Sequence, residues 1–352
     1  MPGNSPIREA FHRQASACRK LGSPFTAQLL DVLAKRLRGN TTVGAAVLNW
    51  PGDPIADALA LRLAGALHAL VLSERSVDLA DVYPPKPPFD DDRLWHAIEA
   101  AIVAHGETVL GFIQRPPQTN EVARSAALAS GFLTIAALTS LPLATLEIGA
   151  SAGLNLHWDS FGYDLGGLDI RKAGSLPLLA PAWQGPSPPK GDVLVTERAG
   201  CDRHPIDIRS KEEILRLRAY IWPDQPDRQA RLDQALAHAR SSPIRIEPTD
   251  AAEWASSRLA ERRNGIVTVL FHSIVWQYIA KDGQARLERI IEHAGRRADC
   301  RAPFAWLRME PKTPKAAALH LTLWPSGKTF FLADVDYHGR WVRWHVEAAK
   351  LS

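Results

Sequence analysis

The chain has 352 residues, of which 46% are hydrophobic and 23% are charged, which is typical of a globular protein large enough for two domains. Its net charge of +4 comes from Lys and Arg spread along the chain, which argues against a nucleic-acid-binding patch. Cys18, Cys201 and Cys300 lie far apart without a CxxC pair, which argues against a disulfide framework or a zinc site and favours the cytoplasm.

The first 115 residues are expected to form a helical cap or bundle. Apolar residues recur every three or four positions over 5–37, 55–72 and 90–106, which is the period of amphipathic helices. The extreme N-terminus carries charges and a proline where a signal peptide needs an apolar run, so secretion is not expected. No stretch of this region has the residue pattern of a β-strand.

From residue 116 to residue 352 the pattern changes to short apolar runs alternating with helices. Strands are predicted at 144–148, 193–196, 244–247, 266–272 and 304–309, and helices at 120–138, 212–220, 228–238, 251–263 and 285–294. This alternation predicts a mostly parallel sheet covered by helices. The runs 319–324, 329–335 and 341–346, separated by tight turns, are predicted to add antiparallel strands.

One uncharged stretch of 22 residues, 125–146, is long enough to span a membrane by hydropathy alone. Gly131 and Pro142 interrupt it, and Pro142 divides it into a helix-like half and a strand-like half. We therefore interpret it as a core helix followed by a core strand, and no membrane partner is expected.

The first predicted strand runs into the motif LEIGASAGLN at residues 146–155. Glu147, Gly149, Ser151 and Gly153 match the acidic-x-Gly-x-Gly-x-Gly motif of S-adenosylmethionine sites, with Ser151 in place of the middle glycine. Glycines at such a turn let a backbone approach a ligand closely, and a helix is predicted to follow. The segment also matches the Gly-x-Ser-x-Gly nucleophile elbow of α/β-hydrolases, and a tight turn without a ligand is a third interpretation.

Context favours the cofactor interpretation over the hydrolase. A hydrolase elbow follows several strands, whereas the residues before this motif are predicted to be helical. In the methyltransferase order the glycine-rich strand comes first, as it does here. Asp202 ends the predicted second strand and is expected to bind the two ribose hydroxyls. Its distance from Gly153 exceeds the usual spacing, which suggests an inserted hairpin and loop near 161–190 and makes Asp164 the alternative for this role.

Further candidates follow the third and fourth strands. Asp250 is expected to accept a hydrogen bond from the adenine amino group. His272 is a candidate general base near the methyl acceptor, and a hydrogen-bonded core histidine is the alternative. Trp276 and Tyr278 are candidates for an aromatic wall beside the methylsulfonium cation, and simple core packing is the alternative.

Five segments together resemble a bacterial family known only as a domain of unknown function: TNEVARSAAL (119–128), EIGASAGLNL (147–156), WPDQ (222–225), HSIVWQY (272–278) and WLRMEP (306–311). The resemblance covers nearly the whole chain. It implies a methyltransferase-like core and assigns no reaction. Within these segments Asn120 and Arg124 are candidates for substrate binding, although Asn120 also fits a helix cap. Glu310, near the end of the fifth strand, is a weaker candidate.

The sequence therefore predicts a Rossmann-like class I methyltransferase sheet at 116–352 behind a helical region at 1–115. The expected function is that of a cytoplasmic protein that binds S-adenosylmethionine and methylates a small molecule. Two alternatives remain: a serine hydrolase with Ser151 as nucleophile, and a non-catalytic nucleotide-binding or scaffold protein on the same fold. No metal and no nucleic-acid partner is expected.

Overall fold

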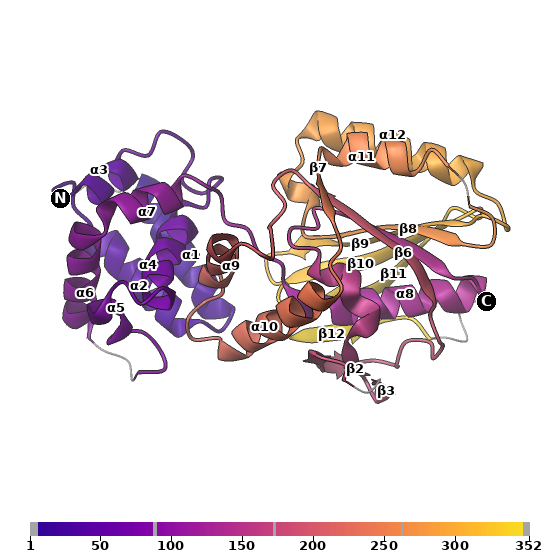
Figure 1. Cartoon of the computed structure of the whole chain (residues 1–352), viewed down its shortest axis with the longest axis horizontal. Coiled ribbons are helices and arrows are strands. Elements are labelled where there is room, and N and C mark those ends of the chain that lie inside the picture. Colours follow the sequence, from indigo (N-terminus) through magenta and orange to yellow (C-terminus); the bar gives the residue numbers. More distant parts are fainter. Residues whose placement is uncertain (1–5, 87–89, 172–173, 262, 348–352) are drawn as a thin grey trace. The chain divides into compact units, whose positions relative to one another are not determined.

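The computed structural model describes residues 6–86, 90–171, 174–261 and 263–347 (Figure 1). The chain forms two compact units. The first consists of residues 1–119 and 209–230, and the second of residues 120–208 and 231–352. The sequence suggested a single boundary after residue 115. The return of residues 209–230 to the first unit is a difference from that expectation.

Helices build all the regular structure in the described part of the first unit. They are α1 (Pro6–Lys20), α2 (Pro24–Arg36), α3 (Thr42–Leu48), α4 (Leu59–Leu72), α5 (Val77–Ala80), α6 (Asp91–Ala104), α7 (Gly106–Ile113) and α9 (Lys211–Ala219). The side chains of Thr41, Ser76 and Asp90 accept hydrogen bonds from backbone N–H groups in the first turns of α3, α5 and α6. Such caps fix where these helices begin.

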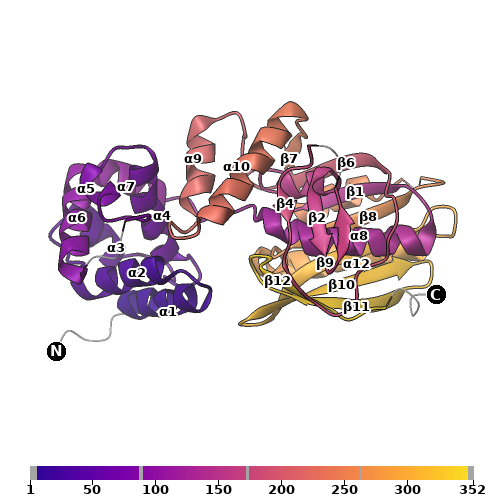
Figure 2. The same cartoon turned by 90° about the horizontal axis from the view of Figure 1, so that it is seen from below.

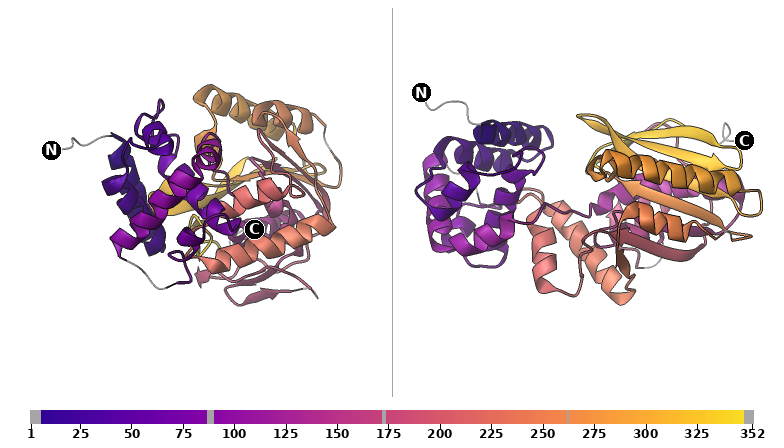
Figure 3. Two further views of the ribbon diagram at one scale, coloured as in Figure 1. Left: turned by 60° about the vertical axis from the view of Figure 1, so that its left-hand side comes forward. Right: turned by 90° about the horizontal axis from the view of Figure 1, so that it is seen from above.

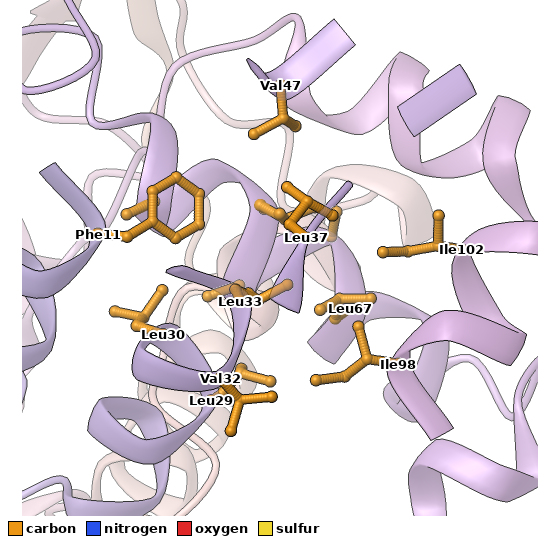
Figure 4. Packing of buried hydrophobic residues seen from close by; sticks show 14 of the residues in the cluster. Phe11, Leu29, Leu30, Val32, Leu33, Leu37, Val47, Leu67, Ile98 and Ile102 are labelled. Atoms are coloured by element: carbon orange, nitrogen blue, oxygen red, sulfur yellow. The ribbon is translucent and has the colours of Figure 1, made fainter. Parts of the chain in front are cut away.

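The first unit has its own hydrophobic core. Figure 4 shows Phe11 of α1 and Leu33 of α2 in the same cluster as Leu67 of α4 and Ile98 of α6. Each of these side chains is at most 1% exposed. Along each helix the buried apolar residues recur every three or four positions, which is the pattern from which amphipathic helices were predicted.

Residues 209–230 join the first unit through polar contacts as well as apolar ones. Arg216 on α9 is buried and donates hydrogen bonds to the carbonyl oxygens of Phe112 and Arg115, at 3.1 and 2.7 Å. The predicted helix at 212–220 was expected to cover the sheet, which is wrong, because α9 packs against α4 of the first unit. Apolar periodicity shows that a helix packs against something, but it does not identify the surface that the helix covers.

The second unit contains a nine-stranded mixed sheet in the order β5-β12-β11-β10-β9-β8-β1-β6-β7. Its strands are β1 (Leu143–Ile148), β5 (Ala182–Gln184), β6 (Val195–Asp202), β7 (Ile246–Pro248), β8 (Val267–Ser273), β9 (Phe304–Thr313), β10 (Ala316–Trp324), β11 (Lys328–Val335) and β12 (Trp341–Trp344). The neighbours β7, β6, β1, β8 and β9 run parallel. The predicted α/β class with a large, mostly parallel sheet is confirmed.

The far half of the sheet is antiparallel. Strands β9, β10, β11 and β12 pair in sequence order, each antiparallel to the next. Within segment 161–190, strand β5 extends this edge by pairing with β12. The same segment forms a separate small sheet from β2 (Gly162–Leu165), β3 (Leu168–Ile170) and β4 (Leu178–Leu179). Antiparallel strands need only short turns, which is why consecutive runs could be recognised as such.

Helices cover both faces of the sheet. Helix α8 (Ser125–Thr139) packs on one face against β9, β10 and β11, and Figure 2 shows it from that side. Helices α11 (Ala251–Arg258) and α12 (Lys281–Arg297) lie on the other face, in front in the right-hand view of Figure 3. Helix α10 (Pro226–Ser241) completes the helices of the described chain.

Helix α8 carries the apolar stretch whose length also fits a membrane span. The window Val122–Thr139 is long and apolar enough for that role, and 72% of it is buried inside the structure. Gly131 lies directly against the side chain of Leu307 on β9, which leaves no room for a larger residue. This packing is that of a core helix, and β1 follows it as the core strand.

Candidate functional site

The carboxyl ends of the parallel strands bring several polar residues to one edge of the sheet. Glu147 lies near the end of β1, Asp202 is the last residue of β6, and Ser273 is the last residue of β8. Glu147 pairs in register with Gly200 of β6, so Glu147 and Asp202 end neighbouring strands. The chain leaves β1 towards β6 and later returns to β8 on the other side of β1. Open α/β sheets bind ligands outside the strand ends at such a switch point.

The motif after β1 forms a tight turn in which three alternate residues have left-handed backbone angles. Gly149, Ser151 and Gly153 have φ of +68°, +55° and +73°. Serine rarely adopts this conformation, and strain of this kind clusters at functional sites. A 3₁₀ helix, η2 (Leu154–Ser160), follows in place of the predicted α-helix. The helix-terminus contribution to ligand binding suggested by the sequence is therefore wrong, because no α-helix begins here.

The two glycines of this turn make room for protein side chains. A Cβ added at Gly149 would lie 2.5 Å from Cγ2 of Val275, and one at Gly153 would lie 2.7 Å from Cδ1 of Ile246. From the sequence, the space beside these glycines was expected to admit a ligand. In the structure, side chains that follow β8 and begin β7 fill it.

Glu147 is buried at the strand end and is 2% exposed. Its Oε2 atom is buried without a hydrogen-bond partner. Burial raises the pKa of the Glu147 carboxyl well above its ordinary value, and the nearby charge of Asp202 raises it further. A hydrogen bond with Asn155 and the charge of Arg124 lower the same pKa by less. Glu147 is therefore a carboxyl group that resists ionisation.

Replacing Glu147 by glutamine is expected to change how stability depends on pH. Because the folded pKa is raised, the native state binds more protons than the unfolded chain between the two pKa values. The contribution of Glu147 to stability is fully present below the ordinary glutamate pKa. It is lost as the pH rises through the raised pKa of the folded state. At neutral pH, E147Q should exceed the wild type in stability by about 1–3 kcal/mol, because the wild type must there bury a charge or bind a proton and the neutral amide does neither. Thermal melts should show this gap closing towards about pH 4; parallel pH profiles would contradict the assignment.

Asp202 holds the turn in place. Its Oδ2 accepts a hydrogen bond from the Ser151 backbone N–H at 2.9 Å, and its Oδ1 accepts one from the His204 N–H at 2.9 Å. The Ser151 hydroxyl is buried and has no hydrogen-bond partner, so no base lies within hydrogen-bond distance of it in the described chain. A serine nucleophile needs such a base. The hydrolase alternative therefore lacks the group that would activate Ser151.

The other two aspartates have local structural roles. Asp250 caps α11 by accepting hydrogen bonds from the N–H groups of its first turn, and it pairs with Arg203 at 2.8 Å. These partners differ from the adenine contact expected from the sequence. Asp164 accepts a hydrogen bond from Gly167 N–H in the β2–β3 hairpin, away from the ends of β1 and β6. Among the described residues, no cluster of His, Cys, Asp and Glu is placed to hold a metal ion.

His272 is a hydrogen-bonded core residue. The ring is 0% exposed, its Nδ1 lies 2.6 Å from Oε1 of Glu310, and its Nε2 accepts the Trp306 indole N–H at 3.1 Å. These partners assign the proton to Nδ1. Both ring nitrogens are engaged and neither faces solvent, which favours the alternative of a hydrogen-bonded core histidine over a general base.

The two aromatic candidates separate. Trp276 stacks on the His272 ring with centroids 5.3 Å apart, so it packs in the cluster beneath the strand ends. Tyr278 is 75% exposed. Both belong to the 3₁₀ helix η3 (Trp276–Tyr278). The two side chains do not form a common aromatic wall, because residues two positions apart on a helix with three residues per turn point in different directions.

Asn120 and Arg124 do lie at the strand ends. Asn120 is buried, and its Oδ1 accepts the Leu154 N–H at 2.9 Å, which ties the start of η2 to the segment before α8. Arg124, in η1 (Val122–Arg124), donates to the Ser273 carbonyl at 3.3 Å. The N-cap contact expected for Asn120 is instead made by Glu121, whose side chain accepts the Ala123 N–H.

Two residues at this edge were not recognised from the sequence alone. Asn155, the last residue of the glycine motif, contacts Glu147 and accepts a hydrogen bond from the Ser125 hydroxyl at 2.8 Å. Ile274 has φ of +56°, a strained conformation for a β-branched residue. Neither an asparagine nor an isoleucine by itself indicates such a role. Asn155 could nevertheless have been noted, because it ends the motif.

The chain belongs to a bacterial family described as "Uncharacterized protein conserved in bacteria (DUF2332)", whose model matches residues 8–344. No curated protein matches the chain. No solved structure matches it either. The resemblance to a bacterial family of unknown function is confirmed.

Proposed function

We propose that the second unit binds S-adenosylmethionine outside the carboxyl ends of β1 and β6, and that the protein methylates a small molecule in the cytoplasm. The observation that carries this proposal is the pair of carboxyl groups, Glu147 and Asp202, ending adjacent parallel strands at the switch point of the sheet. Acidic groups at these positions accept hydrogen bonds from the hydroxyl and amino groups of an adenosyl ligand.

The strand order supports the proposal. Numbered by their order among the parallel strands, β7-β6-β1-β8-β9 read 3-2-1-4-5, which is the order in the corresponding part of Rossmann folds. The glycine-containing turn follows the first of these strands, and antiparallel strands close the sheet beyond the fifth. Methyltransferases of class I share the first feature and end their sheet with a reversed strand.

The polar atoms at the strand ends are compatible with such a ligand. Asp202 uses both carboxylate oxygens for backbone N–H groups, and each oxygen keeps a further lone pair for a ribose hydroxyl. The Glu147 Oε2 and Ser151 Oγ atoms are buried without partners, and buried polar groups normally have one. Donor groups of a ligand that displaces neighbouring side chains, such as Val275, would satisfy them.

Bound S-adenosylmethionine supplies an electrophilic methyl group. The contribution proposed for this chain is positioning, which can lower the barrier of a bimolecular reaction substantially. Asp202 orients the ribose, and Arg124 fixes the β8 end by donating to the Ser273 carbonyl. His272 supports the same end from the core, through Glu310, and takes no part in proton transfer.

Titration of the full chain with S-adenosylmethionine in a calorimeter tests the proposal. Wild type is expected to bind saturably. D202N should weaken binding by about tenfold to a hundredfold, because it removes a charge-assisted hydrogen bond of about 1.5–3 kcal/mol. D164N is the matched control and should bind as wild type, since Asp164 lies in the hairpin.

Absence of wild-type binding would end the proposal and favour a scaffold role. Normal binding by D202N together with lost binding by D164N would move the ribose site to Asp164. The thermal stability of both variants should be measured, because Asp202 also holds the Ser151 turn.

A further inference from the structure

A cavity of about 420 Å³ is lined by residues of α11 and α12 and of the segment that follows α11. Figure 1 shows these two helices side by side on the sheet face opposite α8. The size of the cavity falls within the range of small-molecule sites, which is roughly 300–1,000 Å³. Its lining residues are Ser256, Leu259, Ala260, Arg286, Arg289, Ile290, His293, Ala294 and Arg297. None of them is among the residues at the strand ends, so this cavity is separate from the site described above.

The lining carries positive charge without a compensating carboxylate. Arg286, Arg289 and His293 are exposed and make no hydrogen bond or ion pair within the described chain. Arg297 is already engaged, since it donates to the carbonyl oxygens of Leu259 and Ala260 at the end of α11. The two arginines and the histidine therefore have donors available to a ligand.

Helical spacing separates the charges of α12 onto two faces. Residues 286, 289, 293 and 297 recur every three or four positions and line the cavity. The acidic residues Glu288 and Glu292 are outside the lining, and Glu292 lies 3.6 Å from Arg296. The cationic face of α12 therefore lines the cavity. On the neighbouring face, the ion pair between Glu292 and Arg296 neutralises the charge.

The floor of the cavity is apolar. Leu259 and Ala294 are buried beneath it, and Ile290 is partly buried. Guanidinium groups bind phosphate and carboxylate oxygens with two parallel hydrogen bonds, and a phosphate dianion has enough oxygens and charge to engage two arginines at once. We propose that this cavity binds a small organic phosphate, with its apolar part on the floor and its phosphate between Arg286 and Arg289.

Phenyl phosphate is a suitable probe because it joins a ring to a phosphate dianion, and phenol is its uncharged control. Calorimetric titration of the full chain at low ionic strength should show saturable binding of phenyl phosphate and none of phenol. R286Q and R289Q should each weaken binding by about tenfold, the effect of one charge-assisted hydrogen bond. R296Q removes the same charge from the same helix and should bind as wild type, because Arg296 does not line the cavity.

Absence of phenyl phosphate binding would overturn the proposal. Equal weakening by R296Q and R286Q would also overturn it, since the effect would then be one of net charge and easily screened by salt. The double variant R286Q/R289Q should bind S-adenosylmethionine as wild type does. The result for this cavity is thus independent of the result for the strand ends.

Discussion

Replacing Glu310 by alanine is expected to lower the free energy of unfolding by about 2–4 kcal/mol, because it leaves the buried His272 N–H and the half-buried Val275 N–H without an acceptor. Glu310 Oε1 accepts from Nδ1–H of His272 at 2.6 Å and from the Val275 backbone N–H at 3.0 Å. The imidazole is fully buried, so water can reach it only through the space that the partly exposed Glu310 side chain leaves. Urea unfolding followed by circular dichroism measures the loss.

Two further variants test the cause of this loss. E310Q keeps a carbonyl oxygen at the same place and should lose less than half as much stability as E310A. H272F removes the histidine donor but leaves the Trp306 indole N–H without its acceptor, so H272F and E310A are compared in a double-mutant cycle. E310A should cost less in the H272F background than in wild type, because the Glu310–His272 contact is already absent there. If E310A unfolds at the wild-type urea concentration, the Glu310–His272 contact contributes little and His272 regains its candidacy as a base.

The sheet could be predicted because most of its strands coincide with short apolar runs in the sequence. Strand β1 was expected at 144–148 and begins one residue earlier, and β8 was expected at 266–272 and runs over Val267–Ser273. For strand β6 the apolar signal covers only the start, because Glu197 and Arg198 interrupt it, whereas its end at Asp202 was expected from the likeness to the second strand of methyltransferases. The fold of residues 209–230 with the first unit could not be predicted, since it depends on contacts distant in sequence such as Arg216 with Phe112.

The candidate site was predictable where it depends on strand ends and not where it depends on side-chain partners. Parallel strands place their last residues at one edge, so Glu147 and Asp202 were expected to meet there, and they do. A sequence does not show that Asp250 already caps a helix or that His272 already has two partners. The sequence alone does not distinguish a polar side chain that already has hydrogen-bond partners from one that is available to a ligand.

Replacing Gly149 by alanine is expected to lower the free energy of unfolding by about 2–5 kcal/mol. The left-handed φ of +68° costs a residue with a Cβ about 1–2 kcal/mol, and forcing a methyl group against Val275 adds about 1–3 kcal/mol. Urea unfolding measures the total. Gly167 is the matched control, because its φ is +92° and no atom lies within 4 Å of an added Cβ.

G167A should therefore lose only the backbone part, about 1–2 kcal/mol. Adding V275A to G149A should recover most of the overpacking part, because it removes the two methyl carbons nearest the new Cβ. This cycle also bears on the proposed cofactor site. If G149A costs no more than G167A, Val275 moves aside at little cost, and the turn can open to an adenosyl group. If G149A costs more and V275A restores stability, Val275 closes the turn, and V275A should then bind S-adenosylmethionine more tightly than wild type.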